Sequence, residues 1–132
     1  MILLDTHVLI WLVFEDRRVG RRARRAIDRA WAAGEAAVSA ISFWEVAMLH
    51  DKRRLTLLRD VASWRESLLR DGLVEIPVDG EIATRAGFLR DLSGEPADRV
   101  IVATALEGHR LVTADQHILD WPGALSRLDV TE

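Results

Sequence analysis

Four acidic residues stand at positions from which their side chains could act on one substrate. They are Asp5, Glu45, Asp98 and Asp115. Carboxylates that are brought together repel one another unless a cation neutralises them. Oxygen ligands in this number suit Mg²⁺ or Mn²⁺. A metal ion held in this way polarises a phosphoryl oxygen and activates water, so the pattern indicates hydrolysis of a phosphodiester or phosphomonoester.

Each of these acids also has a purely structural interpretation. Asp5 and Asp115 suit the N-cap of a following helix. Asp98 lies three residues after Glu95, where a carboxylate stabilises the start of a helix. The segment from residue 42 to Glu45 (SFWE) matches a capping box, in which the glutamate reaches back to the cap residue. For any one acid the structural role is favoured, but four of them near strand ends together favour a shared site.

Strands and helices alternate along the chain in an order that could bring these acids together. The apolar runs predict strands over residues 1–4, 36–38, 73–76 and 110–113, with an edge strand over 128–130. Helical spacing predicts helices over residues 8–14, 19–31, 41–50, 57–69, 81–92 and 96–107, and a short helical turn near Ile118. This alternation predicts a parallel sheet covered on both faces. Sites in such sheets lie beyond the carboxyl ends of the strands.

Length and composition limit the function further. The 132 residues are 49% hydrophobic and 30% charged, and we expect residues 1–132 to form one domain. Since cysteine is absent, disulfides, thiolate metal sites and cysteine nucleophiles are excluded. The net charge of −3 argues against unspecific electrostatic binding of nucleic acid. The longest apolar run, residues 8–14, is far shorter than the roughly 20 residues of a membrane span. We see no signal peptide and expect a cytoplasmic location without membrane contact.

Four blocks of the chain resemble the PIN-domain ribonucleases, and among them the VapC-type toxins of toxin–antitoxin pairs. The blocks are residues 2–7 (ILLDTH), 38–46 (VSAISFWEV), 96–105 (PADRVIVATA) and 111–115 (LVTAD). The resemblance covers nearly the whole chain and rests on the order and spacing of the blocks. It implies a three-layer α/β/α sandwich around a mostly parallel sheet.

The resemblance also implies a metal-dependent endoribonuclease that cuts single-stranded or loop RNA. Asp5, Asp98 and Asp115 would hold one or two Mg²⁺ or Mn²⁺ ions, and Glu45 would complete the ligand set or orient the attacking water. Thr6 and Thr113 match hydroxyl residues that support the ligands through hydrogen bonds. The implied partners are RNA, a cognate antitoxin and a second copy of the chain, in a homodimer and a toxin–antitoxin hetero-oligomer.

Two further residues near the third acid are given auxiliary roles. Glu95 is an auxiliary acid, and here the chain departs from many relatives, which carry aspartate before the proline. Arg99 contacts phosphate or forms an ion pair with a neighbouring acid. The four histidines, residues 7, 50, 109 and 117, have no regular metal-ligand spacing. We therefore expect His7 to serve packing or to lie on the surface.

Other functions fit the residues less well. A phosphohydrolase of the haloacid dehalogenase kind needs a second aspartate two residues after the first, where this chain has His7. A receiver-like domain needs a lysine after a late strand, and the only lysine is Lys52, in mid-chain. A non-catalytic PIN-like scaffold predicts that some of the acids are lost, whereas all four are present. A metal-dependent phosphohydrolase and a non-catalytic scaffold stay as the alternatives.

Overall fold

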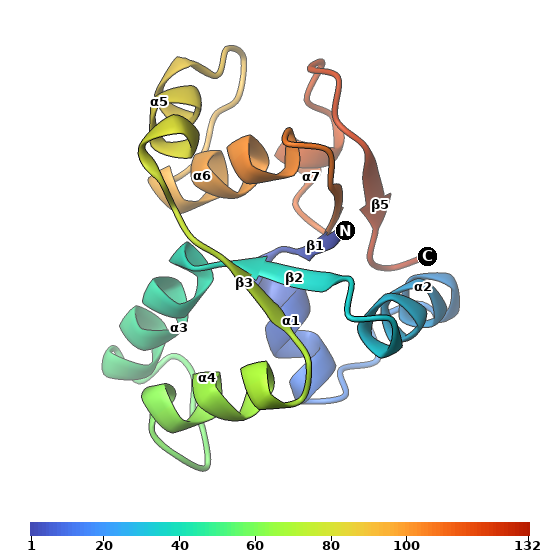
Figure 1. Ribbon diagram of the computed structural model, residues 1–132, viewed down its shortest axis with the longest axis vertical. Helices are drawn as coiled ribbons and strands as arrows, with labels where there is room; N and C mark the ends of the chain where they lie inside the picture. Colours follow the sequence, from blue (N-terminus) through green and yellow to red (C-terminus); the bar gives the residue numbers. More distant parts are fainter.

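Five short strands lie side by side at the centre of the molecule, and helices cover both faces of the resulting sheet (Figure 1). The computed structural model describes all residues, 1–132. The strands are β1 (Ile2–Leu4), β2 (Ala36–Ser39), β3 (Val74–Ile76), β4 (Arg110–Thr113) and β5 (Arg127–Asp129). The helices are α1 (Thr6–Val13), α2 (Arg21–Ala32), α3 (Ile41–Asp51), α4 (Val61–Arg70), α5 (Gly80–Phe88), α6 (Pro96–Ala105) and α7 (Gln116–Leu119).

All neighbouring strands are parallel, in the order β3-β2-β1-β4-β5. The chain runs outward from β1 through β2 to β3, and then returns to the other side of β1 to form β4. The strand order therefore reverses between β1 and β4. Loops that leave the carboxyl ends of two such strands diverge to opposite faces, which opens a crevice where sites of α/β proteins form.

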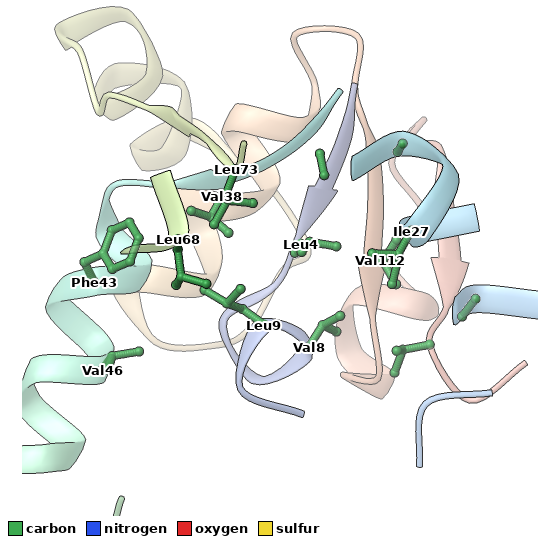
Figure 2. Packing of buried hydrophobic residues seen from close by; sticks show 14 of the residues in the cluster. Leu4, Val8, Leu9, Ile27, Val38, Phe43, Val46, Leu68, Leu73 and Val112 are labelled. Atoms are coloured by element: carbon green, nitrogen blue, oxygen red, sulfur yellow. The ribbon is translucent and has the colours of Figure 1, made fainter. Parts of the chain in front are cut away.

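Successive residues of each strand point to opposite faces, and this alternation divides the core in two. Leu4, Val38 and Val112 pack with residues of α1, α2, α3 and α4 on one face (Figure 2). Leu3 and Leu111 pack with α6 and α7 on the other face, and α5 packs on the outer side of α6. Figure 1 shows α1 to α4 below the sheet and α5 to α7 above it. The predicted three-layer α/β/α sandwich is confirmed, with a sheet that is parallel throughout.

The structure corrects several predicted boundaries. The helix expected from residue 57 begins at Val61, because the Asp60 side chain accepts a hydrogen bond from Ser63 N at 2.9 Å and caps it. The helix expected to reach residue 92 ends at Phe88, and the next residue is extended. The predicted last strand is present at the sheet edge, one residue earlier than expected. None of the helices combines the length and the apolar character that a membrane span requires.

Candidate functional site

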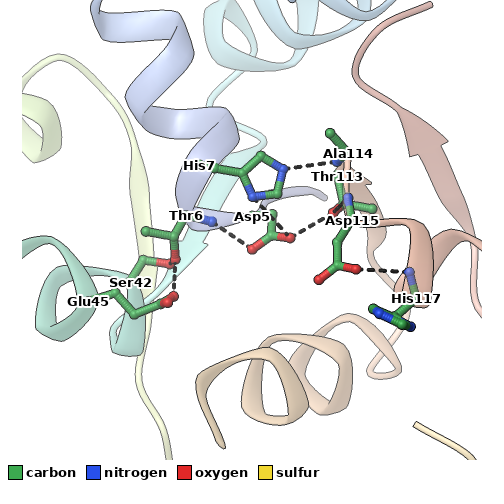
Figure 3. A network of polar contacts seen from close by, with 9 residues as sticks. All are labelled: Asp5, Thr6, His7, Ser42, Glu45, Thr113, Ala114, Asp115 and His117. Atoms are coloured by element: carbon green, nitrogen blue, oxygen red, sulfur yellow. Dashed lines mark hydrogen bonds and ion pairs between the residues drawn. The ribbon is translucent and has the colours of Figure 1, made fainter. Parts of the chain in front are cut away.

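The first candidate residue, Asp5, lies at the carboxyl end of β1, beside β4, where the strand order reverses. It is the N-cap of α1, and its Oδ1 accepts a hydrogen bond from Thr6 N at 2.8 Å. Its Oδ2 accepts a hydrogen bond from Thr113 Oγ1 at 2.7 Å (Figure 3). Asp5 is therefore a helix cap, as its structural interpretation predicts, and it is also tied to the neighbouring strand. Only 2% of Asp5 is exposed, so these two bonds hold the carboxylate in a defined place.

Thr113, the last residue of β4, connects Asp5 with Asp115. Its Oγ1 donates to Asp5 and accepts a hydrogen bond from Asp115 N at 3.0 Å. Asp115 in turn caps α7, because its Oδ1 accepts a hydrogen bond from His117 N at 2.9 Å. Figure 3 shows that the Asp115 carboxylate lies on the same side of the sheet edge as Asp5. One buried hydroxyl therefore links the carboxylate of Asp5 to the backbone of Asp115, the acid that follows the neighbouring strand.

Glu45 is directed toward α1, and it does not form the predicted capping box. The N-cap of α3 is Ala40, and no side chain caps this helix. Instead, Glu45 Oε1 accepts a hydrogen bond from Thr6 Oγ1, and Ser42 Oγ lies 2.8 Å from the same threonine oxygen (Figure 3). A hydroxyl has one proton, so Thr6 donates to the carboxylate and Ser42 donates to Thr6. The capping-box interpretation is wrong because α3 begins at Ile41, so Ser42 lies inside the helix and is not its N-cap.

Asp98 lies in the first turn of α6, and its charge interacts with those of the other acids. Burial raises the pKa of Asp98, and the charges of Asp5, Asp115 and Glu95 raise it further. Burial also raises the pKa of Glu45, with additional contributions from Asp5, Asp98 and Glu95, although the hydrogen bond from Thr6 opposes the shift. Nearby charges of the same sign each make ionisation of the other less favourable. Asp98 is thus a neighbour of Asp5, Asp115 and Glu95, and Glu45 is a neighbour of Asp5, Asp98 and Glu95, near the edge where the strand order reverses.

The two auxiliary residues are placed differently. Glu95 is the N-cap residue of α6, but its side chain makes no capping hydrogen bond. Arg99 directs its guanidinium to backbone carbonyls of the last turn of α5 and of the segment that joins α5 to α6. It forms no ion pair with a carboxylate, so the ion-pair alternative for Arg99 is not observed.

His7 is a residue of the site that sequence reasoning missed. Its Nε2 accepts a hydrogen bond from Ala114 N at 2.9 Å, and its Nδ1 lies 3.7 Å from Asp5 Oδ2 (Figure 3). Since Nε2 accepts, the ring proton is on Nδ1 and faces the Asp5 carboxylate. His7 therefore links the start of α1 to the loop that carries Asp115. The available signal was its place two residues after Asp5, at the same strand end.

Comparison with known proteins identifies the family of this chain. The PIN domain family model matches residues 2–122. The chain belongs to the PIN domain family. Ribonuclease VapC22 of Mycobacterium tuberculosis (strain ATCC 25618 / H37Rv) is 38% identical to this PIN domain over 118 residues, which are 89% of this chain and 88% of that protein. The resemblance stated from the sequence is therefore confirmed.

Solved structures support the same fold for this PIN domain. A toxin–antitoxin complex from Klebsiella pneumoniae matches with a TM-score of 0.66 and 26% identity, over 98% of each chain. The DNA-bound VapBC structure from Salmonella typhimurium matches with a TM-score of 0.71 and 18% identity, over 98% of this chain and 97% of that chain. At that identity the second likeness concerns the fold alone.

The acidic side chains of this PIN domain are chemically suited to bind a divalent cation. They offer carboxylate oxygens, which hard cations prefer, and burial together with the neighbouring acids raises the pKa values of Asp98 and Glu45. As the side chains stand, no three His, Asp or Glu residues are close enough together to ligate one ion. The side chains of these acids would thus have to rotate, without movement of the backbone, to bind a cation.

Proposed function

We propose that this chain is a divalent-metal-dependent endoribonuclease that cleaves single-stranded or loop RNA and acts as the toxin of a toxin–antitoxin pair. The observation that carries the proposal is the meeting of acids at the reversal of strand order, where Thr113 links Asp5 to Asp115 and Glu45 binds Thr6, next to Asp5. Burial and the neighbouring acids raise the pKa values of Asp98 and Glu45. Uncompensated carboxylates in a crevice are characteristic of functional sites. The 38% identity to a protein named Ribonuclease VapC22 supports the substrate class.

In this proposal Asp5, Asp98 and Asp115 hold one or two Mg²⁺ or Mn²⁺ ions, and Glu45 completes the ligand set or orients water. When bound, the cation supplies Lewis-acid polarisation of a phosphoryl oxygen and makes water a better nucleophile at neutral pH. Other side chains of the protein hold the proposed ligands of the cation in place. Thr113 links Asp5 to the backbone of Asp115, and His7 links Asp5 to the backbone of Ala114.

Glu45 is suited to the movement of a proton in this reaction. Its Oε1 accepts from Thr6, so its orientation is set, while Oε2 is left to receive a hydrogen bond from water. Burial raises the pKa of Glu45, and a higher pKa makes a carboxylate a stronger base. Glu45 would therefore orient the attacking water and accept its proton, and the nucleophile would be water throughout.

The proposed partners are RNA, a cognate antitoxin and a second copy of the chain, in the cytoplasm. A match at 26% identity to a chain of a toxin–antitoxin complex supports the antitoxin. An antitoxin that binds a nuclease toxin would keep it inactive until released. The homodimer and the toxin–antitoxin hetero-oligomer are part of the same proposal, which the resemblance to VapC-type toxins supports.

The experiment that tests the function is cleavage of a structured total-RNA pool by the purified protein. Reactions contain Mg²⁺, Mn²⁺ or EDTA, with the wild-type chain and the Asp5→Asn and Asp98→Asn variants. Glu81→Gln is the matched control, since Glu81 lies in the first turn of α5 as Asp98 lies in the first turn of α6, but Glu81 is exposed whereas Asp98 is partly buried.

The proposal expects discrete cleavage that needs the metal, vanishes in both aspartate variants and persists in the control. End mapping of the products then identifies the RNA target. If the folded, antitoxin-free protein cleaves nothing in either metal, the nuclease proposal fails. Metal binding alone would then separate a phosphohydrolase from a non-catalytic scaffold.

A further inference from the structure

The carboxyl end of α5 is closed by a side chain from the next helix. Because the residue after Phe88 is extended, no backbone N–H of a following turn caps the last carbonyls of α5. Arg99 of α6 supplies the missing donors. Its Nε donates to Ala86 O at 3.0 Å, and its Nη2 donates to Gly87 O at 3.5 Å. A cation at a helix carboxyl end is also favoured by the helix dipole.

The same guanidinium holds the segment that connects the two helices, residues 89–95. Its Nη2 donates to Leu89 O at 2.8 Å, and its Nη1 donates to Leu92 O at 2.8 Å. Four of its five N–H groups are thus directed at backbone carbonyls of one stretch of chain. Such a set of contacts needs the planar fork of arginine, because the three donors of lysine radiate from a single atom.

This held segment ends against the candidate site. Gly94 has φ of +153°, and a Cβ atom added to it would lie 3.2 Å from Asp98 Oδ2 and 3.5 Å from Asp98 Cβ. The Gly94 backbone therefore lies directly on the Asp98 carboxylate. The next residue, Glu95, accepts a hydrogen bond from Asp98 N at 3.0 Å through its carbonyl oxygen. The position of the connecting segment thus determines where both acids lie.

We propose that Arg99 is a positioning residue for the acidic site. By holding the carbonyls of residues 86–92, it keeps Gly94 against Asp98 and so maintains the arrangement of Asp98 and Glu95 in which a divalent cation binds. This inference rests on the proposed function. It replaces the expected contact of Arg99 with phosphate, because the guanidinium is occupied by the protein itself.

Two variants separate this role from others. Arg99→Lys keeps the charge but loses the fork, and Gly94→Ala keeps Arg99 but places a methyl group against Asp98. Arg85→Lys is the matched control. Arg85 also joins α5 to α6, through Ala103 O at 3.4 Å and Glu107 at 3.7 Å, but it does not contact the connecting segment.

The first readout is the binding of Mn²⁺ alone, measured by isothermal titration calorimetry on the full chain. We expect Arg99→Lys and Gly94→Ala each to weaken Mn²⁺ binding about 10-fold or more, as loss of a residue that orients ligands does. Arg85→Lys should bind as the wild type does. In RNA cleavage both site variants should lower kcat with little change in KM, and amide exchange over residues 89–95 should accelerate in Arg99→Lys.

Several results would overturn the inference. One is an Arg99→Lys variant that folds and binds Mn²⁺ as tightly as the wild type. Another is a variant whose only defect is a raised KM for RNA, which would indicate direct contact with phosphate. If Arg99→Lys does not fold, Gly94→Ala decides, and unchanged Mn²⁺ affinity in that variant refutes the positioning role. A wild-type chain that binds no Mn²⁺ refutes the proposed function itself, and with it this inference.

Discussion

Replacing Thr113 with valine tests whether one buried hydroxyl organises the acidic edge of the sheet. Thr113 is 0% exposed, donates to Asp5 Oδ2 at 2.7 Å and accepts from Asp115 N at 3.0 Å. Valine has nearly the same shape and keeps the packing of the strand. It removes both hydrogen bonds, so the buried Asp5 Oδ2 loses its hydroxyl donor and the partly buried Asp115 N–H loses its acceptor.

The expected loss of stability follows from these two bonds. A hydrogen bond to a charged group contributes about 1.5–3 kcal/mol to the free energy of unfolding. An N–H left unsatisfied in a buried place costs about 1 kcal/mol or more. Since loosening of the loop would relieve part of this penalty, we expect Thr113→Val to lower the free energy of unfolding by about 3 kcal/mol.

The assay is urea unfolding at pH 7 in EDTA, with Thr104→Val as the control. Thr104 is equally buried, but its Oγ1 donates to Val100 O at 2.7 Å within α6, where that carbonyl keeps its helical N–H partner. The control should therefore lose at most about 1 kcal/mol. If the two variants lose the same free energy, Thr113 does not organise the site and the reasoning from its two contacts is refuted.

Three other predictions concern the same group of residues. Because burial, Asp5 and Asp115 raise the pKa of Asp98, the folded state binds its proton more tightly than the unfolded state, and ionisation of Asp98 destabilises the fold. In urea unfolding at pH 7 without metal, Asp98→Asn should thus raise the free energy of unfolding. This gain should decrease as the pH drops through the raised pKa of Asp98 and vanish below the ordinary value of 3.8. A gain that is independent of pH contradicts this reasoning. Mn²⁺ at 100 times its Kd should stabilise the wild type by about 2.7 kcal/mol in thermal unfolding, and Asp98→Asn much less; an equal shift in both would exclude Asp98 as a ligand. His7→Phe should lower the free energy of unfolding by about 1–3 kcal/mol, because Ala114 N loses its acceptor, and His7→Gln should recover part of this loss in the same urea assay; identical values for the two variants would show that the acceptor is unimportant.

Much of the fold could be predicted from local patterns. Short apolar runs alternate with helical spacing, and parallel strands need crossover helices, so an α/β/α sandwich follows from the sequence and elementary topology. The end of a helix or strand was less predictable where a residue distant in the sequence determines it. The helix expected to continue to residue 92 stops at Phe88, and its last carbonyls are satisfied by Arg99 of another helix. No pattern within residues 81–92 encodes that contact.

For the candidate site, too, some features could be predicted from the sequence and others could not. Residue types and spacing were sufficient to propose Asp5 and Asp115, since acids that follow strands of a parallel sheet meet at one edge. Asp98 was proposed from its place at the start of a helix, and that helix follows α5 and not a strand. The direction of Glu45 was not predictable, because its local pattern suits a cap and its actual partner, Thr6, is 39 residues away. His7 was missed for the same reason.

Sequence by itself therefore determined the class of fold, the edge of the sheet where a site would form and the acids that gather there. These depend on periodicity and on strand ends, which are local properties. Only the tertiary structure decided the partner of each side chain. His7 pairs with Ala114 across 107 residues, and Thr113 pairs with Asp5 across 108. A polar group has several acceptable partners along the chain, and packing alone selects the one that comes within hydrogen-bond distance.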